Sequence, residues 1–151
     1  MLVGIVGVIV LADNEWQQGV MGIVASRITE KYGMPSILIT FDGSIPTLCD
    51  ESPVDLGKGS GRSVEGFNLV TALSECEELL EKYGGHELAA GVSVKDDKVD
   101  EFRQNINQYA TTKPLSVPKL NIDFRLNPAG MSVDMAFAIK SLEPFGMGNP
   151  A

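Results

Sequence analysis

Glycine alternates with other residues in residues 57–63, which read Gly-Lys-Gly-Ser-Gly-Arg-Ser. A period of two is typical of a strand, because successive side chains of a strand point to opposite faces. The segment does not match the phosphate loop G-x-x-x-x-G-K-[ST], since Leu56 and Arg62 stand where that motif has glycine and lysine. It also fails the dinucleotide-binding pattern G-x-G-x-x-G. The alternation therefore predicts a strand rather than a turn that opens a helix.

The same segment is rich in groups that bind anions. Successive backbone amides can form an anion-binding concavity, and an arginine adds a planar, permanently charged fork for a phosphate. We interpret the segment as a phosphate-binding element whose candidate residues are Lys58, Gly59, Ser60, Gly61, Arg62 and Ser63. The alternative is a glycine-rich edge strand or flexible turn without a ligand.

The only histidine of the chain lies in residues 84–91, Gly-Gly-His-Glu-Leu-Ala-Ala-Gly. Glycine can adopt positive φ and present a bare amide, and an imidazole beside such amides suits an anion. We expect a helix to end at Tyr83 with Gly84 as its C′ residue. Gly84, Gly85 and His86 are the second group of candidates, and the alternative for His86 is a satisfied core residue. We predict that His86 and Arg62 meet at one anion site.

An apolar stripe at helical spacing, which includes Val20 and Val24, predicts a helix over residues 19–32. Glycines in its first turn cost about 1 kcal/mol each relative to alanine, which fits a helix start that lies close to another backbone or an anion. Trp16 is interpreted as a core anchor rather than a stacking surface. Arg27, on the same helix, is a further candidate for phosphate binding.

Strand and helix patterns alternate along the rest of the chain. Strands are expected at 5–11, 36–40, 55–63, 86–94 and 119–126, and helices at 19–32, 68–83, 98–109 and 132–142. This order predicts an α/β domain over residues 1–110, a small mixed sheet flanked by helices. Residues 111–118 are interpreted as a linker. Residues 119–151 are interpreted as a strand-helix extension, either the truncated start of a following OB-like domain or an interdomain segment.

The formal net charge of −8 at pH 7 argues against binding of duplex nucleic acid by a broad basic face. A narrow groove needs only local positive potential, while the acidic residues in 75–81 and 96–101 are expected on solvated helices. Residues 1–12 lack a basic start and are too short to span a bilayer, so no membrane association is expected. Cys49 and Cys76 are isolated, which favours reduced thiols and a cytoplasmic location.

Five segments resemble the RecJ family of single-strand-specific 5′ to 3′ DNA exonucleases, in the DHH phosphoesterase superfamily. They resemble W-H-x-G-V-x-G-I-V-A-S-R at residues 16–27, G-S-G-R-S at 59–63, G-G-H-x-x-A-A-G at 84–91, P-x-L-x-I-D at 118–123 and L-x-P-F-G-x-G-N-P at 142–150. The third is the signature of the DHH-associated domain. Gln17 stands where the family often has histidine, so no role of that histidine is carried over.

The resemblance implies a domain that holds the backbone and phosphate of single-stranded DNA for a nuclease of DNA repair and recombination. It places the manganese or magnesium site in a preceding DHH domain of the same protein. Two-metal hydrolysis needs several Asp and His ligands, and this chain has one histidine and no D-H-H sequence. No catalytic or metal-binding residue is therefore assigned here, and the chain alone is expected to be inactive.

Two other functions stay open on the sequence. One is a domain of a DHH-family phosphodiesterase for short oligonucleotides or cyclic dinucleotides, which would lack the segment at residues 144–150. The other is a non-catalytic module that binds nucleic acid as a scaffold. Intact metal motifs upstream of Met1 would favour an enzyme, and degraded motifs would favour the scaffold.

Overall fold

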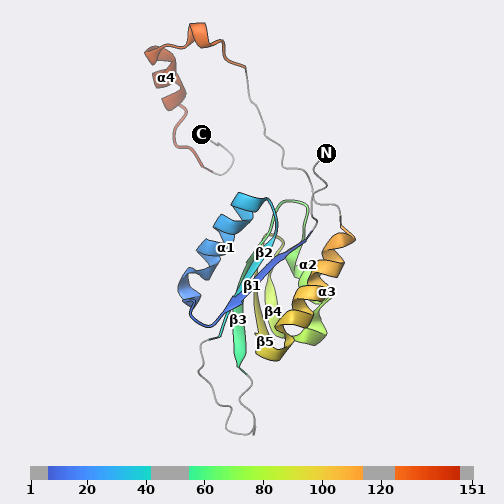
Figure 1. The fold of residues 1–151 in the computed structure, drawn as a ribbon. Coiled ribbons are helices and arrows are strands. Elements are labelled where there is room, and N and C mark those ends of the chain that lie inside the picture. Colours follow the sequence, from blue (N-terminus) through green and yellow to red (C-terminus); the bar gives the residue numbers. More distant parts are fainter. Residues whose placement is uncertain (1–6, 42–54, 114–124, 147–151) are drawn as a thin grey trace. The chain divides into compact units, whose positions relative to one another are not determined.

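The computed structural model describes residues 7–41, 55–113 and 125–146. The chain divides into two compact units, Met1–Pro118 and Lys119–Ala151. The first unit contains a five-stranded sheet with the order β1-β2-β3-β5-β4 (Figure 1). Its strands are β1 (Ile9–Asp13), β2 (Ser36–Thr40), β3 (Leu56–Arg62), β4 (Leu80–His86) and β5 (Ala89–Lys95). β1 and β2 are parallel and the other pairs are antiparallel, which confirms the predicted mixed sheet.

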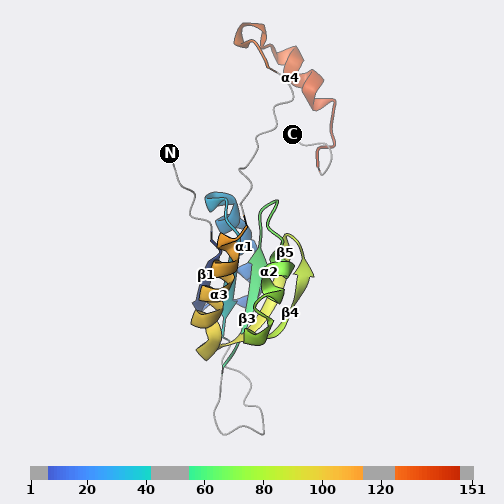
Figure 2. The same cartoon turned by 90° about the vertical axis from the view of Figure 1, so that its right-hand side faces the viewer.

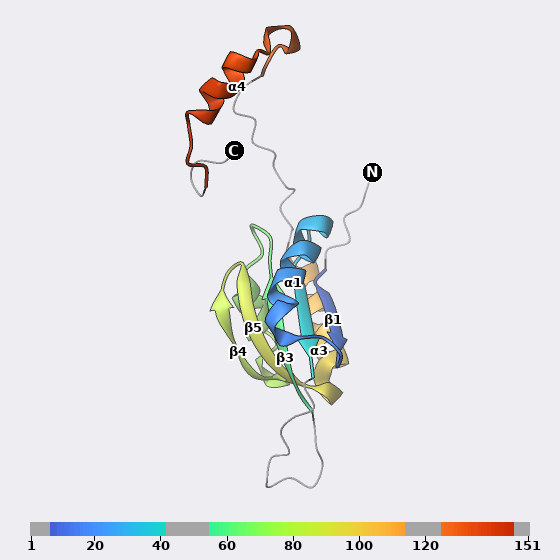
Figure 3. The ribbon, with the colours of Figure 1, turned by 90° about the vertical axis from the view of Figure 1, so that its left-hand side faces the viewer.

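Helices cover both faces of this sheet. Helix α1 (Gln18–Tyr32) packs on one face, over β2 and β3, as Figure 3 shows. Helices α2 (Leu69–Ser74) and α3 (Val99–Thr111) lie on the opposite face (Figure 2). The larger hydrophobic core lies under α2 and α3 and includes Phe67, Phe102 and Ile106, each at most 2% exposed.

Helix α1 ends where the sequence predicts. Gly33 adopts the left-handed conformation with φ 63°, and its amide donates to the Thr29 carbonyl at 2.8 Å. The helix is tied to β2 by a buried polar pair, because the Thr29 and Ser36 hydroxyls lie 2.8 Å apart and Ser36 donates to the Ala25 carbonyl at 2.9 Å. Each of these buried hydroxyls therefore has a hydrogen-bond partner.

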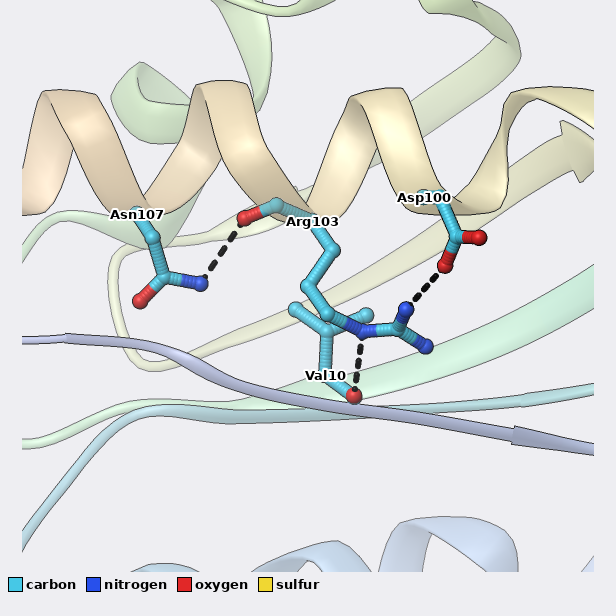
Figure 4. A network of polar contacts seen from close by, with 4 residues as sticks. All are labelled: Val10, Asp100, Arg103 and Asn107. Atoms are coloured by element: carbon cyan, nitrogen blue, oxygen red, sulfur yellow. Dashed lines mark hydrogen bonds and ion pairs between the residues drawn. The ribbon is translucent and has the colours of Figure 1, made fainter.

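Helix α3 is fastened to the start of the edge strand β1 by side chains. Asn107 accepts a hydrogen bond from the Val8 amide at 2.9 Å and donates to the Val8 carbonyl at 3.0 Å. Arg103 donates to the Val10 carbonyl at 3.1 Å and pairs with Asp100 (Figure 4). These contacts satisfy backbone groups on the free edge of β1, which has no partner strand there among the described residues.

The predicted helix over residues 68–83 is wrong beyond its first turns. Asn68 caps the helix as expected, since its side chain accepts from the Thr71 amide, but α2 ends at Ser74. A 3-10 helix follows at Glu77–Leu79, and β4 then begins at Leu80. Tyr83 is therefore a strand residue and Gly84 is not a helix C′ residue. Pairing with β5 outweighs the local helical pattern, and the glycines near His86 do not favour continuation of a helix.

Cys76 is buried in this region and is a free thiol. Burial, with a smaller contribution from the Glu75 charge, raises the pKa of the Cys76 thiol to about 11. The thiol is therefore protonated at neutral pH. Cys49 lies outside the described residues. Among those residues, no helix has the length and apolar character needed to cross a membrane.

The second unit contains a 3-10 helix, Pro128–Gly130, and helix α4 (Val133–Lys140). Ser132 caps α4 as predicted, accepting from the Met135 amide at 3.2 Å. Most of the predicted strand at 119–126 lies outside the described residues, and Arg125 and Leu126 are not in a strand. The linker and domain assignments remain predictions, although α3 extends to Thr111, into the start of the predicted linker.

Candidate functional site

Three rows of side-chain positions run across β3, β5 and β4. Residues directly opposite each other in an antiparallel pair point to the same face of the sheet. The register gives the rows Lys58–Ser93–Lys82, Ser60–Gly91–Gly84 and Arg62–Ala89–His86. The structure thus places half of the ten predicted site residues on one face, in an order set by strand pairing.

This face is the one that carries α1. A methyl group added at Gly22 of α1 would lie 2.8 Å from Arg62 Nη2 and 3.3 Å from Ser60 Oγ, so these side chains point toward the helix. Helix α1 covers β2 and β3, and no described helix lies over β5 and β4 on this side (Figure 3). The outer half of the face is therefore open to a ligand.

Arg62 is held against the strand beneath α1. Its Nη1 donates to the Gly61 carbonyl at 2.8 Å and to Ser60 Oγ at 3.2 Å. Gly22 leaves room for the guanidinium, which explains one of the glycines at the start of α1. No carboxylate among the described residues forms an ion pair with Arg62. Its charge is therefore available to an anion that reaches the face.

His86 is exposed and is the last residue of β4. The preceding Gly85 has φ 146°, and a side chain there would collide with the Ala89 carbonyl at 2.3 Å, so this position requires glycine. The hairpin turn is anchored, because the Leu69 amide donates to the Glu87 carbonyl at 2.9 Å. In the strand register, His86 and Arg62 lie on either side of Ala89. Their backbones are therefore two strand spacings apart, roughly 10 Å.

The glycines of β3 occupy positions from which a side chain would point to the other face, into the core. A methyl group added there would lie 2.5 Å from a Phe41 carbon at Gly57, 2.6 Å from Val92 Cγ2 at Gly59 and 2.8 Å from Leu69 Cδ2 at Gly61. The strand also pairs with β2 and β5 along both edges, so it is a central strand and not an edge strand or a turn. The expected concavity of unpaired amides is therefore wrong, and core packing explains these glycines.

Ser63 follows the strand and holds the local turn. Its hydroxyl donates to the Phe67 carbonyl at 2.7 Å and its amide donates to the Leu88 carbonyl at 2.9 Å. These bonds connect the end of β3 to the hairpin that carries His86. Ser63 thereby helps to keep the two predicted motifs side by side.

A hollow of about 310 Å³ lies on the open face at the row of Lys58. Its lining includes Lys58, Lys82, Gly84, Gly91 and Ser93, together with Gln18 from the start of α1. Sequence reasoning missed Lys82, Ser93 and Gln18. The signal for Lys82 is that Lys82, Gly84 and His86 follow one another at intervals of two residues. This spacing puts them on one face only if residues 80–86 form a strand.

The DHHA1 domain model matches residues 5–112 of this chain. The chain belongs to the DHHA1 domain family. The matched range contains all five strands and the helices α1 to α3, with the three rows described above.

The relatives of this DHHA1 domain include RecJ proteins of several bacteria, which confirms the resemblance. The single-stranded-DNA-specific exonuclease RecJ of Bacillus subtilis (strain 168) is 34% identical over 145 residues, covering 94% of this chain and 17% of that protein. RecJ of Thermus thermophilus is 35% identical over 142 residues, covering 94% and 19%. The chain thus spans about a fifth of the length of these relatives.

Crystal structures of RecJ from Thermus thermophilus share the fold of this chain. The complex with Mg²⁺ aligns with a TM-score of 0.78 at 34% identity, covering 99% of this chain and 22% of the RecJ chain. The complex with Mn²⁺ aligns with a TM-score of 0.80 at 34% identity, covering 97% and 20%. The mixed α/β fold is therefore that of a RecJ DHHA1 domain.

Arg27 is not brought to the rows of this DHHA1 domain. Its side chain is 80% exposed and its Nη1 lies 3.6 Å from a Glu30 carboxylate oxygen. Five residues separate Arg27 from Gly22, which turns it roughly 140° around the helix from the flank that faces Arg62. Trp16, in contrast, packs against Met21 and the rest of a small core cluster, as expected.

The described residues do not fit a metal centre of the kind that RecJ structures contain. No group of three or more His, Cys, Asp or Glu side chains within the described ranges is arranged to hold a metal ion. Hydrolysis by paired metal ions requires several such ligands around two sites. No metal is therefore assigned to these residues of the DHHA1 domain.

Proposed function

We propose that this chain is the substrate-binding domain of a RecJ-like 5′ to 3′ single-stranded-DNA exonuclease that acts in DNA repair and recombination in the cytoplasm. Its task is to hold the DNA backbone and a phosphate while a preceding DHH domain of the same protein, with manganese or magnesium, hydrolyses the phosphodiester. The single observation that carries the proposal is the row in which Arg62 and His86 flank Ala89 on the face that carries α1.

The chemistry of this row suits a phosphate. The Arg62 guanidinium presents a planar pair of donors, which matches two phosphate oxygens and adds a permanent charge. The His86 imidazole supplies a further donor from the neighbouring side of Ala89. Both residues are carried by paired strands, so their backbones are set in place before the substrate binds, and the Arg62 side chain is also held by hydrogen bonds.

The net charge of −8 is compatible with this role, because one cluster of the acidic residues lies away from the rows. Glu75, Glu77 and Glu78 line a separate hollow with Glu101 of α3, on the side of the sheet opposite α1. Local cations decide the potential at a narrow binding face, since exposed charges more than a Debye length away are largely screened. A single strand that follows the rows would meet Lys58, Lys82 and Arg62.

Arg62→Ala tests the proposal directly. We expect weaker binding of a 5′-phosphorylated oligothymidylate, measured by fluorescence anisotropy at several salt concentrations, with the salt slope reduced by about 0.7 for one lost phosphate contact. Arg62→Lys should recover only part of the affinity, because the fork is lost. His86→Ala should weaken binding without lowering the melting temperature, since the side chain is exposed.

Arg27→Ala is the matched control, because it removes the same charge from a position away from the rows. Equal affinity and salt slope for Arg62→Ala and Arg27→Ala would contradict the proposal. The chain alone should release no nucleotides from labelled single-stranded DNA with Mn²⁺ or Mg²⁺, since the metal site is assigned to the preceding domain.

A further inference from the structure

The same face carries two lysines that the proposed phosphate contact at Arg62 does not use. Lys58 of β3 and Lys82 of β4 stand on either side of Ser93 in one row, and all three line the hollow. Their backbones are two strand spacings apart, about 10 Å, so two long lysine side chains can converge on one anion between them. This row lies four residues along β3 from the Arg62 row, or roughly 13 Å.

Between the Lys58 row and the Arg62 row, β5 and β4 present a floor without side chains. Gly84 and Gly91 are directly opposite each other and both are exposed. A methyl group added at Gly84 would meet no other atom within 4 Å, and one at Gly91 would meet only the Gly59 carbonyl at an ordinary 3.8 Å. Neither glycine has a positive φ, whereas Gly85 does.

The fold itself therefore gives no reason for glycine at positions 84 and 91. Glycine weakens a strand interior, because it loses more conformational freedom on folding and has no side chain to pack. The core glycines of β3 are different, since packing excludes a side chain there. The bare floor at Gly84 and Gly91 leaves space above the sheet, within the hollow that these glycines help to line, for the close approach of a ligand.

We propose that Lys58 and Lys82 form a second phosphate subsite for single-stranded DNA, two nucleotides along the strand from the Arg62 row, with the two intervening nucleosides and the phosphate that joins them over Gly84 and Gly91. The spacing of roughly 13 Å between the two rows matches two phosphate-to-phosphate steps of an extended single strand of DNA. A cationic groove that follows the DNA backbone is the usual way to bind such a strand. This subsite deepens the proposed function and rests on it for the substrate class.

The test uses the full chain and a series of 5′-phosphorylated oligothymidylates, pT, pTpT and pTpTpT, titrated by NMR and calorimetry. Only pTpTpT has two phosphates that are two nucleotides apart. Its affinity should therefore exceed that of pTpT by about tenfold, which is the effect expected of one charge-assisted contact. Lys82→Ala should remove this gain and leave the affinity for pT unchanged. Arg62→Ala should weaken binding of pT itself.

Lys113→Ala is the matched charge control, because Lys113 lies at the end of α3, the helix on the opposite face, over the Tyr109 ring. Gly84→Val tests the floor: the melting temperature should stay the same or rise, while the affinity for pTpTpT falls to that of Lys82→Ala. Gly19→Ala, at another glycine with open space, should leave the affinity for pTpTpT unchanged, and its melting temperature should rise because alanine favours a helix. Lys82→Gln, which keeps the length of the side chain, should behave as Lys82→Ala.

The outcomes separate the subsite from the proposed function. Equal affinities for pTpT and pTpTpT, or equal effects of Lys82→Ala and Lys113→Ala, would overturn the subsite, and the proposed function would stand if Arg62→Ala still weakened binding of pT. Unchanged binding of every probe by Arg62→Ala would overturn the proposed contact, and a gain that still depended on Lys82 would then support the subsite alone. A Gly84→Val variant that binds pTpTpT as the unmodified chain does would refute the glycine floor.

Discussion

Gly59→Ala is the substitution whose effect on stability the structure defines most closely. The added methyl group would lie 2.6 Å from Val92 Cγ2, 3.0 Å from Ile39 Cγ1 and 3.1 Å from the Leu38 carbonyl oxygen. Overpacking of this kind costs about 1–3 kcal/mol. Alanine also has less conformational freedom than glycine in the unfolded chain, and this difference offsets about 0.4–1 kcal/mol of that cost. We therefore expect the free energy of unfolding to fall by about 1–2 kcal/mol.

Urea unfolding followed by fluorescence measures this change, because Trp16 is the only tryptophan and packs within the first unit. With an ordinary m-value, the midpoint should fall by roughly 0.5–1 M. Gly84→Ala is the control, since it makes the same chemical change on the same sheet where space is open. In a Val92→Ala background the cost of Gly59→Ala should shrink, because the closest methyl group is absent.

Equal urea midpoints for Gly59→Ala and Gly84→Ala would refute this reasoning. Such a result would mean that packing does not require glycine at position 59. A role in ligand approach would then have to explain the glycines of β3 as well as those of the open face. A lower midpoint for Gly59→Ala alone keeps the two classes of glycine distinct.

Two further predictions concern groups away from the site. Asn107→Ala leaves the Val8 amide and carbonyl without their side-chain partner, so the free energy of unfolding should fall by about 1–3 kcal/mol. The control is Asn105→Ala, on an exposed residue of the same helix, which should change the free energy of unfolding little. Urea unfolding compares the two variants. In a Cys49→Ser background, the Cys76 thiol should react with a disulfide reagent at pH 8 far more slowly in the folded chain than in urea, because folding raises its pKa to about 11. The unfolded chain loses this proton at a lower pH than the folded chain does. The free energy of unfolding should therefore fall as the pH rises from about 9 toward 11.

The local patterns of the sequence predicted the elements that depend on neighbouring residues. The stop of α1 at Gly33, the strand at residues 36–40, and the caps at Asn68 and Ser132 follow from backbone preferences and hydrogen bonds within a few residues. The glycine alternation also predicted a strand in β3. It did not predict that this strand lies at the centre of the sheet, because strand order depends on residues far along the chain.

Strand β4 shows why local pattern was insufficient. Leu69, Ala72, Leu73 and Cys76 have helical spacing and are buried as predicted. Leu80 and the residues that follow nevertheless gain more by pairing with β5. That gain exists only once β5 is part of the sheet, so no short window of sequence contains it. Lys82 was missed for the same reason, since its place in a row is defined by its partner strand.

The sequence by itself determined the candidate chemistry of this domain: an arginine among glycines, a single histidine beside glycines, and motifs of the RecJ family. Only the tertiary structure decided how these residues are arranged. Register placed Arg62 and His86 on one face, turned the β3 glycines into the core and left Gly84 and Gly91 bare beside Lys58 and Lys82. The physical reason is that a side chain's face and neighbours are set by strand pairing, which joins segments that the sequence keeps apart.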